Sequence, residues 1–256
     1  MNGCRKGILS SHTRRCNHSR GFSLVEMLIS LTLIIIVLAV VFEGMVQMQR
    51  RNFAESTKVD MVQQTRDFVD QMVRDIHDVG YPPGRVFSGN PTPTCVGNAS
   101  ISCGLISFSP TQIKYEGDVD GVGTVYQIWM QLVAPASGNC PCILQRGVID
   151  KASALGGSVP TYFTEVNGVL NSGNGAGAAN YGVSLPGGGS YSSYTTADVF
   201  DAYDVNAAPV GTCTGPVACS SIRSLQINAN VAGTFMDPKT NIYPVYSITS
   251  KARLNN

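Results

Sequence analysis

One carboxylate lies inside the apolar segment near the start of the chain, and its position suggests a chemical role. Glu26 is the only charged residue between Phe22 and Phe42. A charge at the centre of a membrane costs about 2.5–3.5 kcal/mol, so it is tolerated mainly where an opposite charge neutralises it. Gly21 and Phe22 form the junction between this segment and a basic segment before it. Gly21, Phe22 and Glu26 are therefore the first candidate functional residues.

The apolar segment is long enough to cross a membrane as a helix. Phe22 to Phe42 comprises 21 residues, and a hydrocarbon core of roughly 30 Å needs about 20. Residues 1–21 carry five Lys and Arg and no acid, which predicts that they stay in the cytoplasm. An ordinary secretory signal would be followed by a small-residue cleavage site, which is not evident here. A plain signal anchor would not need Gly21, Phe22 and Glu26 at this spacing.

The junction resembles the class III signal of type IV prepilins and the related pseudopilins. In that family prepilin peptidase cuts after the glycine, the new N-terminal residue is methylated, and a glutamate four residues later guides assembly. The resemblance implies cleavage between Gly21 and Phe22, methylation of Phe22, and an assembly role for Glu26. It implies prepilin peptidase, other pilin subunits and the pilus assembly machinery as partners. It also implies an inner-membrane protein with a periplasmic C-terminal domain, which later joins an extracellular filament.

Removal of residues 1–21 reverses the sign of the net charge. Lys and Arg fall from 18 to 13 while all 17 acids remain, and 13 minus 17 gives −4. A broad surface for nucleic acid needs clustered Lys and Arg to neutralise phosphates. No nucleic-acid partner is therefore expected.

Six of the eight cysteines follow the apolar segment, and an even number there predicts disulfides in an oxidising compartment. Proximity favours a Cys95–Cys103 pair and a Cys213–Cys219 pair. Cys140 and Cys142 are then left either to pair across one proline or to pair elsewhere. A soft-metal or redox site at Cys140 and Cys142 is the less favoured alternative.

Three acids at alternating positions match the opening of a calcium-binding loop. Glu116, Asp118 and Asp120 precede Gly121, which supplies the bend. The twelfth position is Gln127 instead of the expected glutamate, and the flanking segments are predicted as strands. A solvated hairpin turn is therefore favoured over a calcium site, and no other cofactor is expected.

The histidines argue against catalysis. His12 and His18 precede Gly21, which leaves His77 alone in the mature chain. No acid, base and nucleophile can be assembled around its position near a helix end. The protein is therefore not predicted to be an enzyme.

The helix is predicted to continue beyond the membrane to residue 80. Gly80 ends it, and Tyr81-Pro82-Pro83 prevents its continuation. This half carries an apolar stripe with two possible roles. The favoured interpretation is that the domain's own sheet packs on it, and the alternative is that it contacts a partner helix, as in a coiled coil. Charged residues, Asp75 among them, are expected on the other faces. The stripe consists of Val59, Val62, Thr65, Val69, Met72, Ile76 and Val79.

The rest of the chain is predicted to form strands separated by turns. One long helix followed by a run of strands indicates an α+β fold with an antiparallel sheet. The predicted domains are a leader (1–21), a transmembrane and amphipathic helix (22–80) and a β-rich domain (81–256). Asn171–Ser193 is predicted to be a surface loop. The strands are expected at Leu105–Tyr115, Thr124–Val133, Cys142–Ile149, Thr161–Val166, Ile222–Val231 and Tyr243–Leu254.

The layout is most similar to PilW-type minor pilins, with the J-type pseudopilins of type II secretion as close relatives. The resemblance rests on the leader, the helix end from Met72 to Tyr81, the acidic hairpin Tyr115–Gly123 and the ending Arg253-Leu254-Asn255. It implies a subunit at or near the pilus tip that primes assembly. A tip adhesin that binds through Asn171–Ser193 is an alternative of another class.

Overall fold

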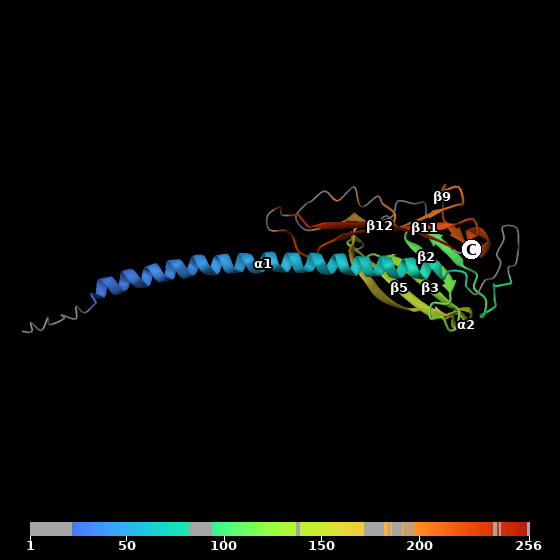
Figure 1. Cartoon of the computed structure of the whole chain (residues 1–256), viewed down its shortest axis with the longest axis horizontal. Helices are drawn as coiled ribbons and strands as arrows, with labels where there is room; N and C mark the ends of the chain where they lie inside the picture. The colour runs from blue at the N-terminus through green and yellow to red at the C-terminus, as the bar shows by residue number, and fades with distance from the viewer. Residues whose placement is uncertain are drawn as a thin grey trace, which may run out of the picture. The chain divides into compact units, whose positions relative to one another are not determined.

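The computed structural model describes residues 22–81, 94–136, 139–171, 182–183, 185, 191, 194, 197–237, 240 and 242–254. The chain divides into two units, Met1–Gln49 and Arg50–Asn256. A long helix, α1 (Leu24–His77), begins in the first unit and ends in the second (Figure 1). The predicted leader, Gly21 included, lies outside the described residues.

Both ends of α1 follow from the local sequence. At the start, the carbonyl of Ser23 accepts hydrogen bonds from the amides of Glu26 and Met27, at 3.0 and 3.1 Å. Beyond the end, Gly80 has a φ of 87°, which suits glycine because it has no side chain. The Gly80 amide donates to the carbonyl of Glu116 at 3.0 Å. The helix is therefore slightly shorter at both ends than the predicted 22–80.

In the second unit α1 buries one face, as the favoured interpretation of its apolar stripe predicted. Two details of that prediction were wrong. Val59 is 60% exposed and does not belong to the buried face. Asp75, expected on a solvent face, is only 3% exposed because it meets polar partners from the sheet. The buried residues of α1 are Met61, Thr65, Phe68, Val69, Met72, Asp75 and Ile76.

The described part of the second unit contains a ten-stranded antiparallel sheet. Its strand order is β10-β1-β2-β3-β5-β6-β11-β8-β9, and β12 pairs with β11. The strands are β1 (Leu105–Ser109), β2 (Gln112–Gly117), β3 (Tyr126–Val133), β5 (Cys142–Asp150), β6 (Thr161–Val169), β8 (Phe200–Tyr203), β9 (Pro209–Val210), β10 (Cys213–Thr214), β11 (Ser224–Ala232) and β12 (Val245–Arg253).

Three smaller elements also lie among the described residues of this unit. A two-stranded parallel sheet joins β4 (Asn139–Cys140) to β7 (Gly182–Val183). Helix α2 (Lys151–Leu155) follows β5 directly, and helix α4 (Pro216–Cys219) follows β10. The Asp150 side chain caps α2 by accepting a hydrogen bond from the Ser153 amide at 2.8 Å.

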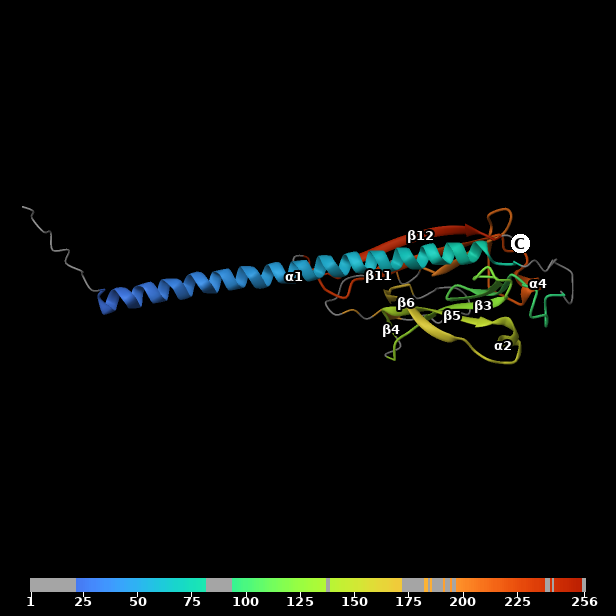
Figure 2. The same ribbon diagram turned by 60° about the horizontal axis from the view of Figure 1, so that its bottom comes forward.

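The core lies between α1 and one face of the sheet. Figures 1 and 2 both show the second half of α1, drawn in cyan, running along the strands. Ile128, Met130 and Leu132 of β3 are buried, while the residues between them are half-buried. This period of two is expected for a strand with one face in the core. The α+β fold with an antiparallel sheet is therefore confirmed.

The predicted strand Leu105–Tyr115 is wrong, because the structure has two strands there. β1 ends at Ser109, and β2 begins at Gln112 after a turn through Pro110. Proline has no amide hydrogen to donate to a strand ladder, which favours a turn at this point. The Gln112 amide donates to Ser109 Oγ at 2.9 Å and closes the turn.

The other predicted strands match observed ones with shifts of a few residues at their ends. Five short strands, β4, β7, β8, β9 and β10, were not predicted. Each has four residues or fewer, which is too short to show a clear alternation. Of the predicted surface loop Asn171–Ser193, only residues 171, 182–183, 185 and 191 are described.

Three disulfides each close a short loop of the second unit. They join Cys95 to Cys103, Cys140 to Cys142 and Cys213 to Cys219. The first and third are the pairs that proximity predicted. For Cys140 and Cys142 the sequence left open whether they pair with each other or elsewhere. In the structure they bond to each other. Because both sulfurs form this disulfide, the soft-metal alternative at these residues is wrong.

Candidate functional site

The predicted assembly residues lie at the start of α1. Phe22 and Ser23 precede the helix, and Glu26 lies in its first turn. A carboxylate in this turn interacts favourably with the positive end of the helix dipole. Phe22 is 74% exposed, and Glu26 is exposed as well. An amine on a neighbouring chain could therefore reach the carboxylate without a change in the fold.

The first half of α1 presents apolar side chains around its surface. Within the described residues, α1 is the helix that is long and apolar enough to cross a membrane, and none of its most apolar stretch is buried. Leu28, Leu31 and Ile35 are each more than half exposed. Such a surface needs lipid or another protein to cover it. It is compatible with the membrane anchor of a prepilin-like protein.

Comparison with known protein families matches residues 16–42 to the prokaryotic N-terminal methylation motif. This supports a type IV pilin-like protein. The matched prepilin-type segment includes Gly21, Phe22 and Glu26, of which Gly21 lies outside the described residues. No curated protein and no solved structure matches the chain.

A buried ion pair lies where the Cys95–Cys103 loop meets the sheet. Lys151 Nζ is 2.6 Å from Glu116 Oε2, and their side chains are 1% and 3% exposed. Lys151 also donates to the carbonyls of Cys95 and Ile101, at 2.9 and 2.7 Å. A buried ammonium is tolerated because its hydrogens find acceptors. One lysine thereby joins α2, β2 and the disulfide loop.

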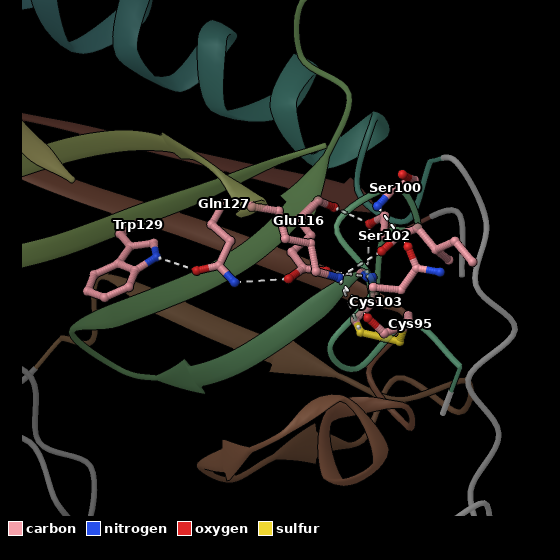
Figure 3. Close-up of polar contacts among 11 residues, drawn as sticks. Cys95, Ser100, Ser102, Cys103, Glu116, Gln127 and Trp129 are labelled. Atoms are coloured by element: carbon pink, nitrogen blue, oxygen red, sulfur yellow. Dashed lines mark hydrogen bonds and ion pairs between the residues drawn. A yellow bond between two sulfur atoms is a disulfide. The ribbon is translucent and has the colours of Figure 1, made fainter. Parts of the chain in front are cut away.

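A chain of hydrogen bonds extends from this ion pair along the sheet (Figure 3). Glu116 Oε2 accepts from the Cys103 amide at 2.7 Å, and Glu116 Oε1 accepts from Gln127 Nε2 at 3.0 Å. Gln127 Oε1 in turn accepts from Trp129 Nε1 at 3.3 Å. Trp129 is the only tryptophan of the protein, so its fluorescence reports on this region.

A second buried carboxylate fastens α1 to the sheet. Asp75 Oδ2 accepts from Arg146 Nη2 at 2.7 Å, from Arg146 Nε at 3.0 Å and from the Tyr115 hydroxyl at 3.1 Å. Asp75 Oδ1 accepts from Gln71 Nε2 at 2.6 Å. Hydrogen bonds to a charged carboxylate are stronger than those between neutral groups. The cluster therefore fixes α1 against β2 and β5.

The three acids proposed for calcium do not share a site. Glu116 is held in the ion pair with Lys151. Asp118 accepts from the amides of Gly121 and Gly123, and Asp120 accepts from the amide of Val122. Among the described residues no group of three or more His, Cys, Asp or Glu could hold a metal. The calcium interpretation of these acids is therefore wrong, because two of them order the turn and one is an ion-pair partner.

Sequence reasoning did not find Lys151, Arg146 or the burial of Asp75. Lys151 is the first residue of α2, where the helix dipole disfavours a positive charge. No local pattern therefore explains a lysine there. Asp75 lies among charged neighbours on a helix, and only the register of β5 places Arg146 opposite it. Both ion pairs join residues more than thirty positions apart.

The raised pKa of the buried Tyr115 phenol makes the stability of the fold depend on alkaline pH. Burial raises the pKa of Tyr115 well above its usual value of 10.0, and the Asp75 carboxylate raises it further. The folded state therefore keeps the phenol proton where the unfolded state loses it. This contribution to the free energy of unfolding is complete below pH about 10 and decreases as the pH rises above that value.

We expect Tyr115→Phe to reduce this alkaline loss. The native protein should lose about 1.4 kcal/mol per pH unit more than the variant above pH about 10, since one proton is linked to folding. Guanidinium unfolding of the full chain in detergent, followed by Trp129 fluorescence, measures the difference. Tyr81→Phe is the control, because Tyr81 is 62% exposed. Equal pH dependence in the native protein and Tyr115→Phe would contradict the expectation.

Proposed function

We propose that this chain is a minor type IV pilin of the PilW-like kind and acts as a structural subunit without catalysis of its own. Prepilin peptidase would cut between Gly21 and Phe22 and methylate the Phe22 amine. The subunit would then leave the inner membrane and join the pilus or prime it, near the tip. The observation that carries this proposal is the methylation motif over residues 16–42 together with a helix that begins at Leu24.

The chemistry of assembly follows from the exposed Glu26. Its carboxylate would accept the positively charged Phe22 amine of an adjacent subunit, because two opposite charges are tolerable in an apolar setting only together. A subunit whose helix is shifted from this register would leave Glu26 unpaired. The apolar side chains around the first half of α1 would pack against neighbouring helices after leaving the lipid.

Features of the second unit support a role outside the cytoplasm. Its three disulfides suit an oxidising compartment. The two ion pairs of the described residues, each with a buried carboxylate, fasten α1 and the Cys95–Cys103 loop to the sheet. The domain would therefore move as one body with the second half of α1. Such a body is suited to be carried at the end of a filament.

Mass spectrometry of the protein from its native bacterium tests the proposal. We expect the mature chain to begin with N-methylated Phe22. A Gly21→Leu variant should keep residues 1–21, because the peptidase would no longer find its glycine. Native protein that retains residues 1–21, in cells whose prepilin peptidase is active, would refute the proposal.

A deletion strain separates the pilus from its close alternative. Loss of pili or of twitching would support the PilW-like assignment. Failure to export folded enzymes with intact pili would instead indicate a J-type pseudopilin of type II secretion. Loss of attachment with normal filaments would indicate a tip adhesin.

A further inference from the structure

An exposed strip of charges lies on the second half of α1. We define the α1 strip as Arg51, Glu55, Val59, Arg66 and Asp70. All five are exposed, and at 100° per residue they fall within an arc of about 100° on the helix. Four of them line a depression of about 530 Å³ on the second unit. Val59, which lines this depression, is a 60% exposed apolar side chain.

The order of charges in the α1 strip is the less favourable of the two for pairing within one helix. In Arg51–Glu55 and Arg66–Asp70 the base precedes the acid by four residues. The opposite order, acid before base, is the one that stabilises a helix better. Neither is among the ion pairs of the described residues, and Arg66 Nε donates instead to the Tyr246 hydroxyl at 3.1 Å. These charges therefore contribute less within a single helix than the opposite order would.

The same interval of four residues separates Phe22 from Glu26. If the Glu26 carboxylate of one subunit meets the Phe22 amine of another, two parallel helices are displaced by four residues, or about 6 Å. At that displacement Arg51 of one copy is level with Glu55 of the other. Arg66 is likewise level with Asp70, and Arg74 with Asp78, just beyond the end of α1.

Other displacements of two copies are less favourable. With no displacement, every charge faces the same charge of the other copy. With a displacement of eight residues, like charges meet at several levels, among them Arg50 with Lys58 and Arg66 with Arg74. At four residues no two like charges of residues 22–78 coincide. Exposed ion pairs add little affinity, but repulsion between like charges selects a register.

Resting on the proposed function, we propose that the α1 strip binds the α1 helix of a second copy of this chain, parallel and displaced by four residues. Arg51 and Arg66 of one copy pair with Glu55 and Asp70 of the other. Val59 packs between these pairs. The strip repeats, beyond the membrane, the register that Glu26 sets within it.

Cysteine cross-linking in the native bacterium tests the register without touching a charge. Two full-length copies with different tags are produced together, one with Val59→Cys and the other with Gln63→Cys. Both positions are exposed and are four residues apart. The described native cysteines form disulfides, and Cys4 and Cys16 are removed with residues 1–21 if cleavage occurs. Oxidation of intact cells then joins thiols that lie close together.

We expect the pair of copies with Val59→Cys and Gln63→Cys to cross-link about fivefold more than two Val59→Cys copies or two Gln63→Cys copies. The reason is that a mismatch of about 6 Å exceeds the tolerance of a disulfide. Immunoblots for the two tags measure the product and the amount of each copy. Equal cross-linking in all three combinations, absence of cross-linking, or cross-linking only to a different protein would overturn the proposal.

Charge reversal between copies tests the pairs themselves. Arg66→Glu in the Val59→Cys copy should reduce cross-linking about fivefold, because the introduced carboxylate would meet Asp70 of the other copy. Asp70→Arg in the other copy should restore it. Asp67→Arg, a neighbouring exposed acid outside the α1 strip, should not. Restoration by neither substitution, or by both equally, would overturn the proposal.

The same samples distinguish failure of this inference from failure of the proposed function. Mass spectrometry of the two copies shows whether each begins with methylated Phe22. Methylated copies that cross-link out of register leave the pilin assignment standing and overturn the α1 strip alone. Copies that keep residues 1–21 in cells with an active peptidase overturn both.

Discussion

Replacing Glu26 with alanine is expected to block incorporation of the protein into filaments while leaving cleavage intact. The variant would leave the Phe22 amine of a neighbouring subunit without its opposite charge in an apolar environment. Removing one partner of a buried pair costs about 3–5 kcal/mol. Every 1.4 kcal/mol changes a binding constant about tenfold. Incorporation should therefore fall at least about 100-fold. Glu26→Gln, which keeps the shape and removes the charge, should behave similarly.

Immunoblots of sheared filaments and of membranes measure this effect, and mass spectrometry confirms processing. Glu43→Ala is a matched control, because Glu43 is an exposed acid of α1 beyond the apolar segment. It should incorporate normally. Normal incorporation of Glu26→Ala would rule out the proposed pairing of the carboxylate with the amine.

Replacing Lys151 with methionine is expected to cost about 3–5 kcal/mol of unfolding free energy. The substitution leaves the Glu116 carboxylate buried, with only the Cys103 amide and Gln127 as polar partners for its oxygens. It also leaves the carbonyls of Cys95 and Ile101 without the ammonium that they accept from. Loosening of the disulfide loop over β2 should follow.

Guanidinium unfolding of the full chain in detergent, followed by Trp129 fluorescence, measures this loss. Lys251→Met is the control, because Lys251 is exposed, although it lies over the Tyr203 ring; it should cost less than about 1 kcal/mol. A double variant, Lys151→Met with Glu116→Met, should be more stable than Lys151→Met alone because no uncompensated charge remains. A single variant as stable as the native protein would show that the ion pair contributes nothing to folding.

Among the described residues, two ion pairs with buried carboxylates hold the helix, sheet and disulfide loop of the second unit in place. Arg146–Asp75 fastens α1 to the sheet, and Lys151–Glu116 fastens the Cys95–Cys103 loop to it. A buried pair is not by itself a source of large stability, but breaking one is costly. The pairs therefore specify one arrangement of helix, sheet and loop. That arrangement leaves the α1 strip on the exposed side of the helix.

Local patterns predicted the extent of α1 well. The apolar run, Gly80 and the step of three and four along α1 depend on neighbours within a few residues. The α+β fold was also predictable, because strand alternation is local. Predictions weakened where strands were very short, as in β8 and β9, and where Pro110 divided one expected strand into two.

The charged residues of the domain were predicted poorly. Glu116 was grouped with Asp118 and Asp120 by spacing, yet its partner is Lys151, thirty-five positions away. Asp75 was placed in solvent because its helical neighbours are charged, yet Arg146 comes from β5. Which basic residue pairs with each of these acids depends on how the strands align, and no single segment of the sequence determines that alignment.

By itself, the amino-acid sequence determined the prepilin-type segment, the length and polarity of α1 and two of the three disulfides. These depend on contacts between residues close along the chain, where spacing implies proximity. Only the tertiary structure decided which acids are buried, which lysine and arginine neutralise them, and which face of α1 is left exposed. The physical reason is that burial and ion pairing depend on how distant strands align, and a carboxylate acquires its role from the charges that the fold brings beside it.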